Sequence, residues 1–243
     1  MSDRTPRGGP ELPWLRRVSR SSITWAVGAA FERAARFGTR LPMARPERHG
    51  VLVDKDIAYR STGDEAHLLD IYRPTEADGP LPVVVYIHGG GFRVLSKDTH
   101  WVMAIEFARR GYVVASINYR LAPGHPYPAA PDDCCAAWLW VLDHIADYGG
   151  DPTRIAVSGE SAGGNLATVV SVAACYPRHE PWARAVYDRG QVPTACVPAC
   201  GILQVSDPRR FERKGLSSRL TQPIIDACFA NYVGGNGRHE LFS

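Results

Sequence analysis

The sequence predicts an α/β fold in which a mostly parallel central sheet is flanked by helices. Short runs rich in β-branched residues have the character of strands that are covered on both faces. Longer segments with helical apolar spacing separate them, so strand and helix alternate along the chain, as they do in α/β domains. With 243 residues, 45% of them hydrophobic, the chain is long enough to bury a large core in one such domain.

Each expected element follows from its own pattern. Residues 82–87 (PVVVYI) are almost wholly apolar, so we expect them to form the centre of the sheet. The other expected strands are residues 51–60, 68–73, 112–117 and 154–157, with turn residues between 68–73 and the central strand. The expected helices are residues 101–110, 129–148 and 161–174, the second of them entered through a proline cluster.

The two ends of the chain carry weaker signals. Residues 1–48 predict a basic, helical N-terminal cap region, and residues 49–243 predict an incomplete catalytic domain. Residues 195–205 suit a further strand, and residues 211–232 have the apolar spacing of a helix in a cap element. We expect residues 208–243 to face the cap or to be irregular.

Charge is distributed unevenly, and its pattern argues against a nucleic-acid partner. The formal net charge is +3, while residues 1–48 hold ten arginines against four acidic residues. No dense basic run lies beside aromatic residues, and no zinc-type Cys/His spacing occurs. Residues 16–31 superficially resemble a twin-arginine export signal, but Glu32 ends the apolar run early, so we interpret them as an amphipathic helix. Membrane-surface contact through this helix is the less favoured alternative, and homo-oligomerisation stays open.

The six cysteines indicate a reducing compartment. None of them forms a Cys-x-x-Cys pair, and a chain of this size needs no disulfide bonds to fold. We therefore expect free, mostly buried thiols in a cytoplasmic protein. Cys134 and Cys135 fall on an expected helix, where we interpret them as packing residues rather than reactive thiols.

The pentapeptide at residues 159–163 (GESAG) carries the first chemical signal. It has the form Gly-x-Ser-x-Gly, and it follows an expected buried strand and opens an expected helix, the context in which such a serine is exposed on a tight turn. Its glycines accept strained backbone angles, and the helix N-terminus favours a developing negative charge. We interpret Ser161 as a nucleophile, with a structural turn or a phosphate-binding turn as the alternatives.

The second signal is His88-Gly89-Gly90-Gly91, at the end of the expected central strand. Successive glycines free backbone N–H groups to point into a site, and acyl transfer needs two or three such donors around the tetrahedral oxygen. The loop therefore predicts an oxyanion hole, with a flexible glycine turn as the alternative.

Together with residues 119–123 (YRLAP) and 150–152 (GDP), the two motifs in this order resemble the hormone-sensitive-lipase-like family of carboxylesterases. The resemblance covers about residues 68–176. It implies an α/β-hydrolase fold with an N-terminal cap, and hydrolysis of short- to medium-chain carboxylic esters through an acyl-enzyme. Four residues are implied in the chemistry: Ser161 as the nucleophile, and Gly89, Gly90 and Ala162 as donors of the oxyanion-hole N–H groups.

The resemblance also implies supporting roles for His88, Gly91 and Glu160. His88 orders the glycine loop and is not the general base. Glu160 stands beside the nucleophile, where the family often has Asp, and a buried carboxylate there needs a hydrogen-bonding partner. Residues 119–130 resemble a stretch that braces the serine turn and lines the pocket, although Gly124 stands where the family commonly has an acidic residue. We expect this departure to affect local bracing more than chemistry.

The sequence does not identify the acid and the base of a catalytic triad. In this fold both follow the serine in chain order, on loops after later strands. The candidates after Ser161 are Asp188, Asp207, Asp226, His179 and His239. None of them stands in the sequence setting that the family uses, although Asp207 is the least poor acid. We therefore expect the last strands to be absent, the sheet to end in an exposed edge, and this chain to be weakly active or inactive.

Three functions remain open at this point. A serine esterase is favoured because both motifs are intact, and the missing histidine is the argument for a non-catalytic small-molecule binding protein on the same fold. Amide or lactone hydrolysis would use the same machinery. No metal, nucleotide or flavin motif occurs, so we expect no cofactor and a small-molecule ester as the ligand.

Overall fold

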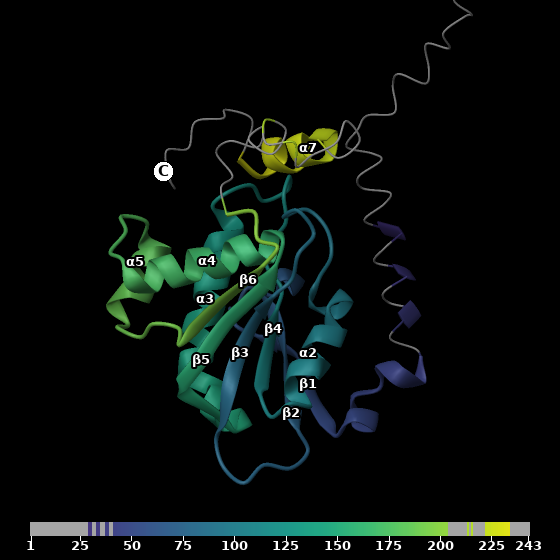
Figure 1. Ribbon diagram of the computed structural model, residues 1–243. Helices are drawn as coiled ribbons and strands as arrows, with labels where there is room; N and C mark the ends of the chain where they lie inside the picture. The colour runs from purple at the N-terminus through teal and green to yellow at the C-terminus, as the bar shows by residue number, and fades with distance from the viewer. Residues whose placement is uncertain are drawn as a thin grey trace, which may run out of the picture.

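A six-stranded sheet with helices on both faces forms the centre of this computed structural model (Figure 1). The structure describes residues 29–30, 33–34, 37–38, 41–203, 213, 215 and 222–233. The strands are β1 (Val51–Ala58), β2 (Leu68–Pro74), β3 (Leu81–Ile87), β4 (Val113–Ile117), β5 (Gly150–Glu160) and β6 (Ala195–Ala199). The α-helices described from end to end are α2 (Trp101–Ala108), α3 (Ala129–His144), α4 (Ala162–Cys175), α5 (Pro181–Asp188) and α7 (Gln222–Val233). Short 3-10 helices are η2 (Pro42–Ala44), η3 (Pro46–His49), η4 (Glu65–His67), η5 (Lys97–Thr99) and η6 (Ile145–Tyr148).

The strand order is β1-β2-β4-β3-β5-β6, and the sheet is mostly parallel. β4, β3, β5 and β6 pair in parallel, while β2 pairs antiparallel with both β1 and β4. Parallel neighbours need crossover connections, which α2, α3 and α4 provide along the chain. The prediction of an α/β fold with a mostly parallel sheet flanked by helices is confirmed.

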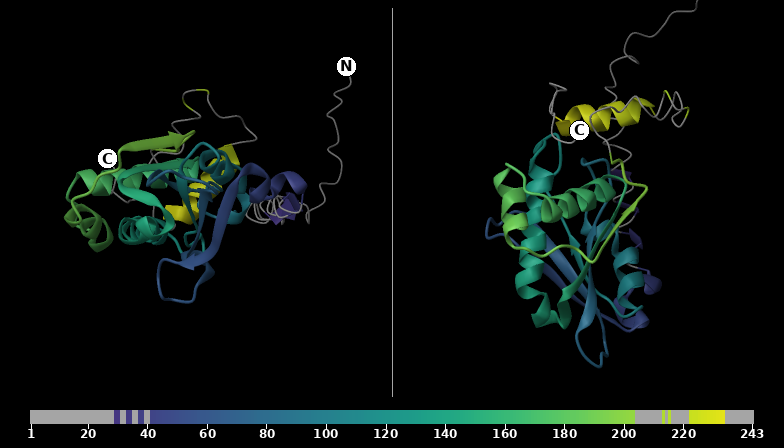
Figure 2. Two further views of the ribbon diagram at one scale, coloured as in Figure 1. Left: turned by 90° about the horizontal axis from the view of Figure 1, so that it is seen from below. Right: turned by 60° about the vertical axis from the view of Figure 1, so that its left-hand side comes forward.

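β3 lies between β4 and β5, and its side chains alternate between two buried faces. Val83, Val85 and Ile87 pack in the cluster that includes side chains of α3, α4 and α5. Val84 and Tyr86 pack in a second cluster, with side chains of α2. Figure 2 shows these helices on opposite sides of the sheet. Because both faces are covered, successive residues of the run can all be apolar without being exposed, which explains the PVVVYI pattern.

Several boundaries differ from those expected. The run at 154–157 is part of the longer β5, and the expected strand at 195–205 ends at Ala199. α5 was not expected; it is a helix of eight residues that buries Ala183 and Val186. The expected N-terminal helices lie largely outside the described residues, as does most of the segment 208–221.

The expectation of mostly buried cysteines is wrong. All six are free, but Cys175, Cys196 and Cys200 are exposed, Cys228 is half-buried, and only Cys134 and Cys135 are buried. The exposed thiols lie at the end of α4 and along β6, which has a strand partner on one side only within the described part of the chain. The side chains of an edge strand have neighbouring strands on one side only, so they are less fully covered than those of a central strand. The packing role expected for Cys134 and Cys135 agrees with their burial.

Among the described residues, no helix combines the length and the apolar character that crossing a membrane requires.

Candidate active site

The parallel register of the sheet brings the two sequence motifs together. Ile87 at the end of β3 pairs with Gly159 of β5 on one side and with Ile117 of β4 on the other. The chain therefore leaves β3 into His88 and leaves β5 into Ser161 at the same edge of the sheet. α7 lies across this edge (Figure 1).

Ser161 occupies a strained turn between β5 and α4. Its backbone angles are φ 51° and ψ −113°, a region that residues with a side chain seldom adopt. Its N–H donates to the carbonyl oxygen of Ala199 at 2.9 Å, and its own carbonyl oxygen accepts from Ile202 at 3.3 Å. Hydrogen bonds to the end of β6 and to the residues after it thus hold the turn in place.

The glycines of the pentapeptide are required by close packing. A Cβ built on Gly163 would overlap the carbonyl oxygen of Ile87 and lie 2.6 Å from that of His88. A Cβ on Gly159 would lie 2.6 Å from the same oxygen of Ile87. No side chain fits at either position, so the helix after Ser161 packs directly on the end of β3.

The glycine loop turns sharply beside Ser161. Gly90, Gly91 and Phe92 all have positive φ, and the N–H groups of Arg93 and Val94 close the turn on the carbonyl oxygen of Gly90 at 3.1 and 3.2 Å. Within the described part of the chain, no acceptor binds the N–H groups of the three residues implied in the oxyanion hole, Gly89, Gly90 and Ala162. Unengaged N–H groups at a helix N-terminus and a glycine turn can stabilise an anionic oxygen.

His88 lies beneath this loop and is held as a neutral imidazole. Its Nδ1 donates to the carbonyl oxygen of Gly89 at 2.7 Å, and its ring stacks on Tyr119 with centroids 4.3 Å apart. Tyr119 in turn donates its hydroxyl to the carbonyl oxygen of His88 at 2.9 Å. Burial, and secondarily the neighbouring His100, lowers the pKa of His88 to about 3. These contacts fit a residue that orders the loop.

Glu160 contacts both motifs, but it is not buried. Its side chain is 47% exposed, which corrects the expectation of a buried carboxylate. The expected partner exists: Oε1 lies 2.8 Å from Nε2 of His100. A Cβ on Gly89 would lie 3.0 Å from the Glu160 carbonyl oxygen and 3.2 Å from Oε1. A side chain at residue 89 would therefore crowd Glu160, so the glycine loop lies close to the residue before Ser161.

A buried ion cluster, which no sequence pattern predicts, anchors the segment between the glycine loop and α2. The Lys97 side chain is only 2% exposed, and its Nζ lies 2.7 Å from Asp56, 2.8 Å from Asp70 and 3.2 Å from Asp98. The backbone N–H of Lys97 also donates to Asn118 Oδ1 at 2.7 Å. Strands β1 and β2 thus fix η5, and with it His100.

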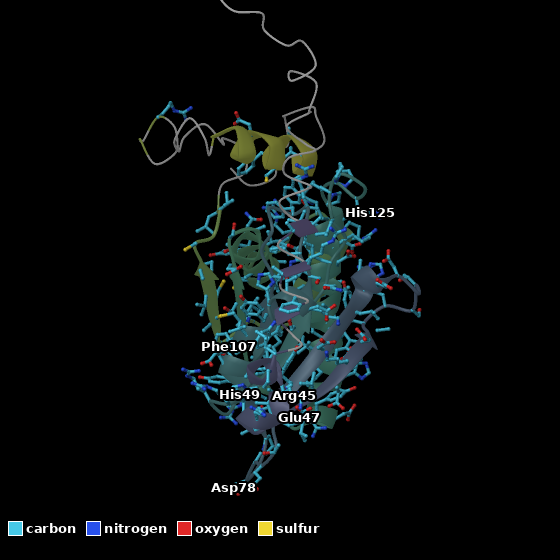
Figure 3. All side chains as sticks on the ribbon, turned by 90° about the vertical axis from the view of Figure 1, so that its right-hand side faces the viewer. Arg45, Glu47, His49, Asp78, Phe107 and His125 are labelled. Atoms are coloured by element: carbon cyan, nitrogen blue, oxygen red, sulfur yellow. The ribbon has the colours of Figure 1, made fainter. Side chains whose placement is uncertain are left out.

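Two hollows lie at different places in the described part of the molecule. One, of about 320 Å³, is lined by residues that include His88, Leu95 and Tyr119, but not by Ser161. The other, of about 550 Å³, is lined by residues that include Arg45 and Glu47. Figure 3 shows Arg45 and Glu47 at the end of the molecule far from α7, whereas His125 lies near α7.

The triad candidates are not brought together by the described residues. Asp188 lies at the end of α5 and pairs with Arg184 at 2.7 Å, and His179 is exposed just before that helix. Asp226 lies on α7. Asp207 and His239 are outside the described residues. Nor does that part of the chain bring three or more His, Cys, Asp or Glu side chains together in a way that could hold a metal ion.

The parallel sheet, the strained serine between strand and helix, and the glycine loop after the neighbouring strand define the class of α/β hydrolases. The chain belongs to that family: a family model described as alpha/beta hydrolase fold matches residues 84–243. The predicted resemblance to carboxylesterases is likewise confirmed by the curated relatives.

Two curated relatives come from Mycobacterium tuberculosis. Carboxylesterase NlhH is 50% identical over 166 residues, which cover 68% of this chain and 49% of NlhH. Esterase LipI is 48% identical over 99 residues, or 40% of this chain and 30% of LipI. The chain thus spans about half the length of NlhH. It spans a smaller share of LipI, which it matches over a shorter stretch.

Solved structures agree on the fold. A hyperthermophilic esterase from the archaeon Pyrobaculum calidifontis matches with a TM-score of 0.64 at 28% identity, covering 93% of this chain and 70% of that protein. Esterase LipW from Mycobacterium marinum matches with a TM-score of 0.54 at 34% identity, covering 67% of this chain and 52% of LipW. Esterase B from Lactobacillus rhamnosis has a TM-score of 0.69 at 20% identity, covering 90% and 65%, and supports the fold alone.

Proposed function

We propose that this chain carries the nucleophile and the oxyanion hole of a carboxylesterase that acts on small-molecule esters of short to medium acyl chains. The observation that carries the proposal is Ser161, at positive φ between β5 and α4, beside a glycine loop with unengaged N–H groups. The names of the relatives, carboxylesterase and esterase, support the same class of reaction.

In the proposed reaction, Ser161 Oγ forms a bond to the ester carbonyl carbon and transfers its proton to a general base. The carbonyl oxygen becomes the oxyanion, which the N–H groups of Gly89, Gly90 and Ala162 stabilise. The C–O bond to the alcohol then breaks, the alcohol leaves with a proton, and water hydrolyses the acyl-enzyme to the free acid. The base is not assigned to any described residue.

Two serines on the same helical segment allow a matched test by ester hydrolysis. Ser161→Ala removes the proposed nucleophile, whereas Ser171→Ala removes a hydroxyl that only donates to the carbonyl oxygen of Ala167 within α4. In the full-length natural protein, Ser161→Ala should lower the hydrolysis of p-nitrophenyl butyrate by roughly 10³-fold or more. Ser171→Ala should leave it within about twofold, as for a surface change.

If wild-type and Ser161→Ala proteins hydrolyse the ester equally, the proposal is wrong. A folded wild-type protein that binds esters without turning them over would favour the non-catalytic binding function. The expectation that the present 243-residue chain is weak or inactive remains a prediction, and the same assay on that chain tests it.

A further inference from the structure

Arg93 is the first charged side chain after the glycine loop, and its backbone is part of the loop's turn. Its N–H donates to the carbonyl oxygen of Gly90 at 3.1 Å, and it follows Gly91 and Phe92, which both have positive φ. The position of the Arg93 Cα is therefore fixed relative to the proposed oxyanion hole.

Among the described residues, no carboxylate pairs with the guanidinium of Arg93. Its Nε and Nη1 are buried, and within the described part of the chain neither has a hydrogen-bond acceptor. Other described arginines pair with carboxylates: Arg60 with Asp132, Arg73 with Asp54, Arg120 with Asp133, and Arg154 with Asp151. Removing a cation from water without a partner is unfavourable, so an anion that reaches Arg93 would bind with little competition from the protein.

α7 covers this part of the loop. Tyr232 of α7 stacks on Phe92 with ring centroids 3.7 Å apart, and its carbonyl oxygen accepts from the N–H of Tyr127 at 2.8 Å. A Cβ on Gly91 would lie 2.7 Å from Cys228 Sγ of the same helix. The positive charge of Arg93 partly offsets the rise in the pKa of Cys228 that burial causes, as expected for a guanidinium close to that thiol.

These contacts place the Arg93 guanidinium near the part of α7 that packs on the glycine loop through Tyr232 and Cys228. Arg93 is only partly covered, so one part of its guanidinium remains open to solvent while Nε and Nη1 are not. Nη2 is not among the buried atoms, so a carboxylate can approach the guanidinium at this nitrogen and accept a charge-assisted hydrogen bond from it.

We propose that Arg93 binds a carboxylate on the substrate, so that the preferred substrates are esters carrying a free carboxylate group. This inference rests on the proposed esterase function and adds the substrate class. Such a substrate would place its ester carbonyl at the glycine loop and its carboxylate at Arg93, two residues beyond Gly91.

The test compares charged and neutral esters of matched shape. One pair carries the charge on the acyl side, mono-p-nitrophenyl glutarate against its methyl ester. The other carries it on the alcohol side, 4-acetoxybenzoate against its methyl ester. Each pair is measured with the full-length natural protein and with Arg93→Gln, which removes the charge at similar length. Arg110→Gln, at an exposed site beyond the end of α2, is the matched control for net charge.

The wild-type protein should prefer the charged member of at least one pair. Arg93→Gln should lower kcat/KM for that ester about tenfold, mainly through KM, as for loss of a charge-assisted hydrogen bond. Hydrolysis of the neutral ester should stay within about twofold in Arg93→Gln, and the preference should persist in Arg110→Gln. Equal preference in wild-type and Arg93→Gln proteins, or no preference in either pair, would overturn the inference.

A binding measurement separates this inference from the esterase proposal. Thermal shifts with glutarate and benzoate, against glutaramide and benzamide at the same ionic strength, need no turnover. We expect saturable stabilisation by at least one of the two carboxylates in the wild-type protein and none in Arg93→Gln.

If no ester is hydrolysed but this Arg93-dependent binding is present, the esterase proposal fails and the anion site stands. If neutral esters are hydrolysed and no carboxylate stabilises the protein, the anion site is wrong. Arg93→Met, which also removes the charge at similar length, replaces Arg93→Gln if the latter does not fold.

Discussion

His100 Nε2 lies 2.8 Å from Glu160 Oε1, and Glu160 directly precedes Ser161. His100 directly precedes α2, and its Nδ1 is within hydrogen-bond distance of Thr99 Oγ1, at 2.8 Å. The pair therefore links the segment that follows the glycine loop to the residue before the proposed nucleophile.

Removing Glu160 should impair the proposed reaction through geometry. In Glu160→Ala, Gly89 loses the side chain it packs against, so the oxyanion donors should no longer be held at a fixed distance from Ser161. We expect kcat to fall about tenfold with KM nearly unchanged. Glu106→Ala, at an exposed ion pair with Arg110, is the control and should keep its activity. Wild-type kcat in Glu160→Ala would show that Glu160 does not position the loop.

Gly163→Ala should destabilise the protein strongly, because its Cβ would overlap the backbone of Ile87 and backbone cannot move aside as a flexible side chain can. We expect a loss of at least about 3 kcal/mol in the free energy of unfolding by urea. Gly124→Ala is the matched control: its Cβ would meet only the Leu121 carbonyl oxygen at 3.7 Å. Similar midpoints for the two variants would mean that the close approach at Gly163 is not rigid.

Lys97→Met should also destabilise the fold, since it leaves the carboxylate of Asp70 buried without its cation. The Asp70 side chain is 1% exposed, and loss of one partner of a buried ion pair costs about 3–5 kcal/mol. Lys55→Met, at an exposed position of β1, should change the free energy of unfolding by less than about 0.5 kcal/mol. A shift of under about 1 kcal/mol in Lys97→Met would contradict an anchoring role for the cluster.

His88 should make stability fall with acidification. Its pKa is about 3 in the folded protein and near 6.5 when unfolded, so below pH 6.5 the unfolded state binds a proton that the folded state does not. The contribution is complete above pH 6.5 and is lost as the pH falls toward 3. Between pH 7.5 and 5, wild-type protein should lose about 2 kcal/mol more than His88→Gln in urea unfolding. Equal losses in both proteins would show that His88 titrates normally in the fold.

The elements that the sequence predicts well are those with a local pattern. The apolar run at 82–87 must alternate between two covered faces, and the pentapeptide at 159–163 needs glycines at fixed spacing, so both are visible in a short window. α5 is amphipathic, but with eight residues it spans only about two turns, too short a window for its periodicity to stand out along the chain.

The pairings that hold the site together leave no such trace. His100 and Glu160 are 60 residues apart, and Lys97 is 41 residues from Asp56, so only the folded sheet reveals that they meet. The same holds for Arg93: only the fold shows that Nε and Nη1 are buried without an acceptor among the described residues. The triad acid and base are assigned neither by the sequence nor by the described residues.

Intact-mass spectrometry of the full-length natural protein after exposure to a fluorophosphonate tests the central claim most directly, because the reagent marks an activated serine covalently. We predict a single adduct, located on Ser161 by peptide mapping, present in Ser171→Ala and absent from Ser161→Ala. A folded wild-type protein that forms no adduct, or one that is modified equally in Ser161→Ala, would contradict the assignment of Ser161 as the nucleophile.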